Sequence, residues 1–180
     1  GGRPKTKLWG LRGFGKNAYI ATCEAIDDEV DWLVLATDTD RESGVRRQRD
    51  LEEICQRKRR EIAAGYDKAR SDLRETTHPK LIVAVPLRML ECWLLADADA
   101  FRRVVGRPRP KLPKRPEALG GKTDPKELLY KYGGAHHKRE LARESSPEVL
   151  SRECPVSYVP FRADVLHAAE SLESRSTNSL

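Results

Sequence analysis

Two acidic residues, Asp38 and Asp40, directly follow the largely apolar run Asp31–Thr37. Such a run is typical of a strand buried on both faces of a parallel sheet. Ligands of these sheets bind beyond the carboxyl ends of the strands. Two carboxylates there can hold Mg²⁺ beside a phosphate, because Mg²⁺ takes one or two carboxylates and keeps several waters. The alternative is structural: Asp38 ends the strand, and Asp40 or Ser43 caps the next helix.

A third acid, Glu91, lies within an apolar stripe on a helix predicted over residues 87–98. Burying an unpaired carboxylate is costly, so Glu91 needs a partner, a proton or a cleft. We expect Glu91 to face the same cleft as Asp38 and Asp40 and to act with them in catalysis. The alternative is a salt bridge, for example to Arg88.

A basic segment over residues 102–116 contains seven Lys or Arg, four Pro and no acid. Proline at this density predicts a loop. The charge suits phosphate contacts that position a nucleic acid without reading its sequence. Arg107, Arg109 and Lys111 are therefore the candidate nucleic-acid-binding residues. The alternative is a solvated connector.

The elements that would position these residues alternate between strand and helix. Strands are predicted over Asp31–Thr37 and Lys80–Val85, with a long polar helix over Val45–Glu75 between them. This alternation predicts an α/β fold with a parallel-sheet core, followed by a helical C-terminal half. The charged run Arg57–Arg60 is interpreted as a solvated face of the long helix, and Gly65 as a point where that helix can kink or split. Further helices are predicted over residues 15–26, 125–132, 147–152 and 161–172.

The composition restricts the function classes. The 180 residues include 34 Lys or Arg against 28 Asp or Glu, a net charge of +6 that suits an anionic partner. No apolar run approaches the length of a membrane span. The four cysteines form no CxxC pair and are interpreted as ordinary thiols of a cytoplasmic protein.

The chain combines Asp38-x-Asp40 at a strand end, a later strand, Glu91-Cys92-Trp93-Leu94-Leu95-Ala96-Asp97, Asp124-Pro125-Lys126 and Phe161. Together these features resemble a Toprim-related family. Members of that family accompany ABC-type ATPases in bacterial anti-phage systems, and one is the effector of the PARIS system. The resemblance spans residues 7–172, and its most specific part is the ExWLLxD pattern.

The resemblance implies a single Toprim-like domain over residues 1–172. The polar residues 173–180 are predicted to form a flexible tail. It implies a nuclease that cuts DNA or RNA, with Mg²⁺ or Mn²⁺ held by Asp38 and Asp40. Glu91, Trp93 and Asp97 map onto the family's own motif. The expected partners are nucleic acid, an ABC-type ATPase and a second copy in a homodimer, in the cytoplasm and without a membrane.

Toprim enzymes also use a Glu after their first strand as a general acid or base. No acid precedes Glu24 in this chain, so we expect the first strand and its Glu to lie upstream of Gly1 or to be absent. Two other functions stay open. One is a non-catalytic Toprim-like subunit that binds an ATPase partner or nucleic acid. The other is a haloacid-dehalogenase-like phosphatase, although Glu42 stands where its nucleophile loop has Thr or Val.

Overall fold

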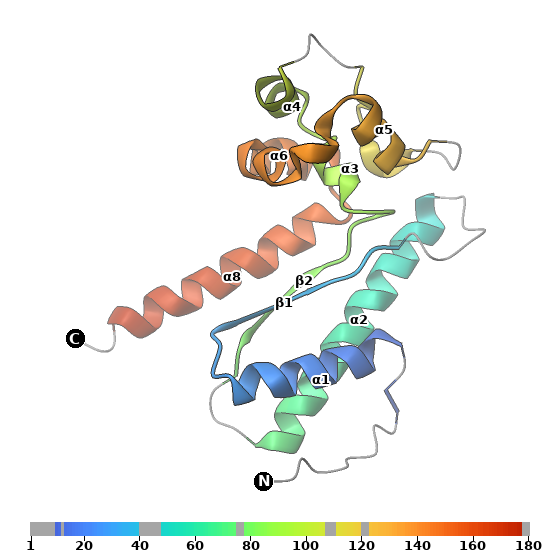
Figure 1. The fold of residues 1–180 in the computed structure, drawn as a ribbon. Coiled ribbons are helices and arrows are strands. Elements are labelled where there is room, and N and C mark those ends of the chain that lie inside the picture. Colours follow the sequence, from blue (N-terminus) through green and yellow to red (C-terminus); the bar gives the residue numbers. More distant parts are fainter. Residues whose placement is uncertain are drawn as a thin grey trace.

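The computed structural model describes residues 10–11, 13–39, 48–74, 78–106, 111–119 and 123–177. It is a mixed α/β structure in which the described strands are parallel and most other elements are helices (Figure 1). The predicted α/β class and helical C-terminal half are confirmed. In chain order the elements are α1 (Phe14–Asp27), β1 (Trp32–Ala36), α2 (Gln48–Leu73), β2 (Lys80–Ala84), α3 (Glu91–Leu94), α4 (Ala98–Val105), η1 (Pro116–Ala118), α5 (Pro125–Lys131), η2 (Gly134–His136), α6 (Lys138–Glu144), α7 (Pro147–Glu153) and α8 (Tyr158–Thr177).

The two described strands pair in parallel, with Trp32 opposite Lys80 and Ala36 opposite Ala84. Parallel strands need a long crossover connection, and α2 supplies it. Both strands lie within their predicted ranges, so the sheet and its direction are as the sequence indicates.

Helices α1 and α2 cover one face of the sheet. Their shared core includes Leu51 and Ile62 of α2 together with Val83 of β2. The helices cross at Gly15 and Gly65, where a Cβ on Gly65 would overlap the Gly15 carbonyl oxygen. Gly65 does not split α2, which is continuous. Its missing side chain instead allows the two backbones to approach closely.

The opposite face of the sheet is covered only in part. Helix α8 runs along β2 (Figure 1), where Ala84 packs against Tyr158 and other residues of a second core. On β1, however, Trp32 is 41% exposed and Val34 is 54% exposed. The prediction that this strand is buried on both faces is therefore wrong, because α8 does not extend over β1.

The predicted helix over residues 87–98 is also wrong in its length. Only the single turn of α3 is helical there, and a separate helix, α4, begins at Ala98. The Asp97 side chain accepts hydrogen bonds from the backbone N–H groups of Asp99 and Ala100, so it caps a new helix. Helices α3, α4, α5 and α6 then gather beyond the end of the sheet (Figure 1).

Helices α1, α2, α5 and α7 agree with the predictions within a few residues, whereas α6 has no counterpart among the predicted helices. Asp124 caps α5 as expected, by accepting a hydrogen bond from the Lys126 N–H. Helix α8 is longer than predicted, since it starts at Tyr158 and continues to Thr177. The predicted domain boundary at residue 172 stays a prediction. None of the helices in the described part of the chain has the length and apolar character needed to cross a membrane.

Candidate functional site

The two parallel strands end side by side at the edge where the sequence places the candidate site. Beyond β1, the Thr37 N–H donates to the Ala84 carbonyl oxygen at 2.9 Å. The chains stay connected beyond this bond, because the Arg88 N–H donates to the buried Thr39 hydroxyl at 2.6 Å. Arg88 has a φ of 68°, a conformation that is strained for a large side chain. The loops after β1 and β2 are thus held together directly beyond the sheet.

A buried cation from α2 reaches the same edge. The Lys58 side chain is only 4% exposed. Its ammonium donates to the Asp38 carbonyl oxygen at 2.5 Å and lies 4.7 Å from the centre of the Phe14 ring. A carbonyl and a ring face replace only part of the water that an ammonium loses on burial. The packing of α1 and α2 therefore holds a positive charge beside the first strand end.

This finding corrects the interpretation of Arg57–Arg60 as a solvated face, which is wrong for Lys58. A signal was present in the sequence. Lys58 lies four residues before Ile62 and four after Ile54, so it falls within the apolar stripe of the helix. The same reasoning that singled out Glu91 would have singled out Lys58.

Arg59 has a structural role at the outer edge of β2. One guanidinium nitrogen donates to the Val83 carbonyl oxygen at 2.6 Å, and another pairs with Asp164 of α8 at 2.8 Å. The same Asp164 oxygen accepts from the Val83 N–H at 3.0 Å. Both backbone groups of Val83 are thus satisfied by side chains, which fastens α8 and α2 to the second strand. Sequence reasoning did not find this pair.

Two polar groups at the sheet edge lack partners among the described residues. The half-buried Asp38 carboxylate receives no hydrogen bond or ion pair from that part of the chain. The Arg88 Nε is buried and also without a hydrogen-bond partner there. Native proteins satisfy most buried groups of the kind that Arg88 Nε represents. An unpaired carboxylate oxygen is a ligand that Mg²⁺ accepts, so Asp38 fits a cation site.

The predicted second ligand, Asp40, lies outside the described residues. Among those that are described, no three His, Cys, Asp or Glu side chains form a group that could hold a metal ion. The pairing of Asp38 with Asp40 stays a prediction.

Glu91 begins α3 and faces a cavity of about 400 Å³ between α3, α5 and α6. Its carboxylate is nearly buried and accepts from the Lys138 ammonium at 2.7 Å. The partner is therefore Lys138 of α6 and not Arg88. Asp38 is not among the residues that line this cavity, and a joint role of Glu91 with Asp38 and Asp40 stays a prediction.

Trp93 connects α3 to the start of α8 through a buried polar chain. Its indole Nε1 donates to the Ser157 hydroxyl at 2.7 Å, which in turn donates to Glu117. Glu117 also accepts from the Ser157 N–H at 3.0 Å and the Val156 N–H at 3.2 Å. Burial raises the pKa of Glu117, and the hydrogen bonds that it accepts from Ser157 and Val156 oppose the rise. Sequence reasoning missed Glu117.

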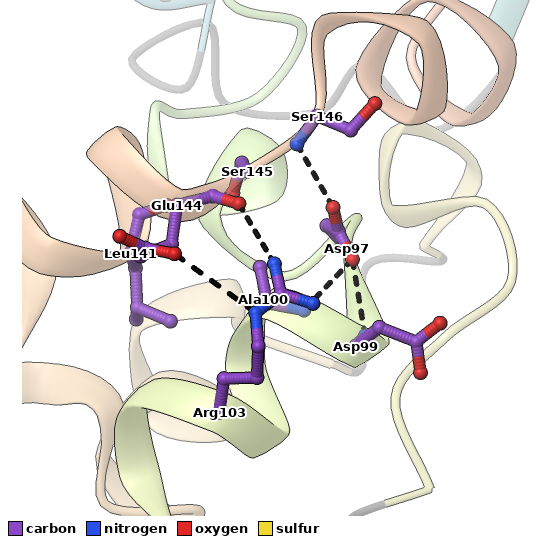
Figure 2. Close-up of polar contacts among 8 residues, drawn as sticks. All are labelled: Asp97, Asp99, Ala100, Arg103, Leu141, Glu144, Ser145 and Ser146. Atoms are coloured by element: carbon purple, nitrogen blue, oxygen red, sulfur yellow. Dashed lines mark hydrogen bonds and ion pairs between the residues drawn. The ribbon is translucent and has the colours of Figure 1, made fainter.

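Asp97 completes the ExWLLxD segment by joining two helix starts. One carboxylate oxygen caps α4, at 3.0 Å from the Asp99 N–H and 2.9 Å from the Ala100 N–H. The other accepts from the Ser146 N–H at 2.9 Å, directly before α7. Figure 2 shows Asp97 between these two groups of donors. The described contacts of Trp93 and Asp97 are thus those of structural residues.

The basic segment begins on a helix and not in a loop. Arg102 and Arg103 belong to α4, where Arg102 pairs with Asp99. Arg103 donates to the Glu144 carbonyl oxygen at 3.1 Å (Figure 2). The predicted loop over residues 102–116 is therefore wrong at its start, because α4 continues to Val105.

The candidate nucleic-acid-binding residues are only partly described. Arg107 and Arg109 lie outside the described residues, and Lys111 is exposed. Their role in binding stays a prediction.

The cysteines offer no reactive thiol in the buried parts of the structure. Burial raises the pKa of Cys55 to about 11 and that of Cys92 to about 12. It also raises the pKa of Cys154. A thiol that stays protonated is a poor nucleophile, which agrees with the interpretation as ordinary thiols.

A family model described as "Domain of unknown function (DUF4276)" matches residues 13–157, well over half of the chain. The chain belongs to this family. The DUF4276 match starts directly before α1 and ends where α8 begins, so it includes the sheet edge and the whole Glu91–Asp97 segment. No curated protein and no solved structure matches the chain.

Proposed function

We propose that the chain is a metal-dependent nuclease that hydrolyses phosphodiester bonds of DNA or RNA. The site is the carboxyl edge of the sheet, with Mg²⁺ or Mn²⁺ held by Asp38 and Asp40. One observation carries the proposal: the Asp38 carboxylate is half-buried at this edge without a partner among the described residues. A carboxylate oxygen that no described donor occupies is open to a cation such as Mg²⁺.

The residues of the edge would divide the work. A bound Mg²⁺ would polarise a phosphoryl oxygen and make its water more acidic. Asp38 and Asp40 would hold it, while Lys58 and Arg88 would supply positive charge near the phosphate. Glu91 stays a candidate third acid, although Lys138 already pairs with its carboxylate.

The setting of this activity is part of the proposal. The resemblance of Asp38-x-Asp40 and ExWLLxD to the Toprim-related family supports a Toprim-like core and a role in anti-phage defence. It also supports action in the cytoplasm with an ABC-type ATPase partner and a homodimeric assembly. The net charge of +6 suits a nucleic-acid substrate.

A cleavage assay with matched variants tests the proposal. Plasmid DNA, single-stranded DNA and structured RNA are incubated with the chain and Mg²⁺, Mn²⁺ or EDTA. Asp38→Asn and Asp40→Asn should each reduce the cleavage rate by at least about tenfold, as expected for disturbing a metal site. Asp67→Asn is the control, because Asp67 is an exposed acid on α2. Cleavage that persists in EDTA, or in Asp38→Asn, would contradict the proposal.

A non-catalytic binding subunit is the second candidate. It is favoured by the ion pair of Glu91 with Lys138, which already occupies the candidate third acid. This function predicts no cleavage with any cation, together with nucleic-acid binding that Asp38→Asn leaves unchanged or strengthens by removing a negative charge. Gel-shift titrations beside the cleavage assay separate the two functions.

A further inference from the structure

A second cavity lies away from the sheet edge, between α3, α6, α7 and the start of α8, with a volume of about 620 Å³. This volume is within the range of small-molecule binding sites, roughly 300–1,000 Å³. None of the side chains that line it is acidic. Asp38, Lys58 and Arg88 do not line it, so it is separate from the proposed nuclease site.

The floor of this cavity is apolar and largely aromatic. The Trp93 ring lies 5.3 Å from the Tyr158 ring and 5.2 Å from the Phe161 ring, measured between centres. Leu90 adds an aliphatic side chain that is 51% exposed. The Trp93 indole N–H is already bonded to Ser157, so this ring presents no free donor to a ligand.

The rim carries positive charge that no described acid neutralises. Arg139 and Arg143 are exposed, lie one turn apart on α6 and have no ion pair in the described part of the chain. Like charges at this spacing destabilise a helix slightly, and a bound anion would relieve the repulsion. Lys138 also lines the cavity, but Glu91 pairs with it.

Tyr158 adds a neutral donor. No described residue hydrogen-bonds its hydroxyl. Burial raises the pKa of Tyr158, so the hydroxyl keeps its proton at neutral pH. The Tyr158 hydroxyl, like the Arg139 and Arg143 guanidinium groups, can therefore donate a hydrogen bond to a ligand. A ligand that accepts hydrogen bonds would satisfy all three groups.

We propose that this cavity binds a small organic anion, with the apolar body on the aromatic floor and the anionic group against Arg139 and Arg143. A carboxylate or a nucleotide phosphate has the required chemistry. The floor favours a compact apolar body over a stacked base, because Trp93 and Tyr158 are 7% and 9% exposed and pack edge to face. Stacking a base needs an open ring face.

The test uses the full chain and 1-anilinonaphthalene-8-sulfonate, an apolar aromatic anion that fluoresces on binding. We expect saturable binding at one site. Naphthalene-2-carboxylate should displace the probe, whereas the neutral naphthalene-2-methanol should compete at least about tenfold more weakly, as for a lost charged hydrogen bond. If AMP displaces the probe and naphthalene-2-carboxylate does not, the anionic group that the cavity binds is a nucleotide phosphate. No saturable binding, or equal competition by the neutral alcohol, would overturn the proposal.

Variants locate the site. The double substitution Arg139→Gln and Arg143→Gln should weaken binding by about tenfold or more. The control is the double substitution Arg49→Gln and Arg60→Gln at exposed positions of α2. It removes the same charge and should leave binding unchanged. Ala142→Phe fills the cavity from an exposed position on α6 and should block binding without changing the thermal melt. Equal affinity in the Ala142→Phe protein and the wild type would show that the probe binds elsewhere and that the proposal is wrong.

Discussion

The buried carboxylates of the helical region and the polar groups of the sheet edge differ in how fully they are satisfied. In the helical region, Asp97 accepts three backbone hydrogen bonds and Glu117 accepts from three donors. At the sheet edge, the Asp38 carboxylate and the Arg88 Nε have no partner among the described residues. Satisfied networks hold a fold in one arrangement, whereas unsatisfied groups are expected where a ligand binds.

The strongest sequence signal of the chain thus lies apart from the proposed metal site. The ExWLLxD segment is the most specific motif of the chain, yet its Trp93 and Asp97 side chains position helices. Asp38, from the weaker Asp38-x-Asp40 pattern, lies at the edge that has groups without described partners. A specific motif therefore identifies what a family needs in order to fold as readily as what it needs in order to act.

The largest expected effect tests the structural role of Asp97. Asp97→Ala removes the cap of α4 and leaves the Ser146 N–H without its acceptor. We expect it to lower the free energy of unfolding by about 2–4 kcal/mol, measured by urea denaturation. Asp99→Ala is the control, because Asp99 is exposed and pairs only with Arg102 on the same helix. If Asp97→Ala lowers the unfolding free energy no more than Asp99→Ala does, the structural role of Asp97 in the helical region is wrong.

A somewhat smaller loss is expected at Ser157. Ser157→Ala removes the hydroxyl that joins the Trp93 indole to Glu117, and it leaves a buried donor and a buried acceptor short of a partner. We expect a loss of about 1–3 kcal/mol in unfolding free energy. Ser151→Ala is a suitable control, since its exposed hydroxyl bonds only within α7 and to Arg162. Equal losses in both variants would show that the buried hydrogen bonds of Ser157 stabilise the fold no more than the hydrogen bonds of Ser151.

Glu117 gives the same region a pH dependence. Its pKa is raised from 4.5 in the folded state, chiefly by burial, so the folded protein holds this proton more tightly than the unfolded chain. The resulting stabilisation is complete below pH 4.5 and is lost as the pH rises through the raised pKa. Urea denaturation across this interval should show a decline in the wild type that Glu117→Gln reduces. Glu140→Gln, on the exposed part of α6, should keep the decline. If the unfolding free energy of Glu117→Gln declines with pH as much as that of the wild type, other groups cause the decline.

The smallest effect on stability is expected at Asp38. Asp38→Asn should change the free energy of unfolding by less than about 0.5 kcal/mol, as for residues without native partners. Millimolar Mg²⁺ should raise the melting temperature of the wild type by mass action and leave that of Asp38→Asn unchanged. Asp67→Asn should respond like the wild type. Equal responses in all three proteins would remove Asp38 from any metal site.

Features determined by local sequence could be predicted. The apolar runs that became β1 and β2 were found, as was the start of α5, where Asp124 and the following proline act on adjacent residues. The long helix α2 was found because its apolar stripe repeats over many turns.

Features that depend on packing could not be predicted. The exposure of Trp32 and Val34 follows from where α8 lies, about 130 residues later in the chain. The apolar stripe over residues 87–98 indicated one helix, but Asp97 caps a new one because Ser146 comes near enough to share its carboxylate. At the candidate site, Asp38 was identified from its place after a strand. The burial of Lys58 against Phe14 depends on how α1 crosses α2.

The hydrogen bond from the Val83 N–H to Asp164 can form only late in protein synthesis. Asp164 follows Val83 by 81 residues, which at about 5–20 residues per second corresponds to about 4–16 s of translation. Until that segment leaves the ribosome, the outer edge of β2 lacks the hydrogen-bond partner of its Val83 N–H. The sheet whose end carries Asp38 is thus completed only when α8 has been made. A nascent chain that stops before α8 has Asp38 but not the Asp164 side chain that completes the edge of the sheet.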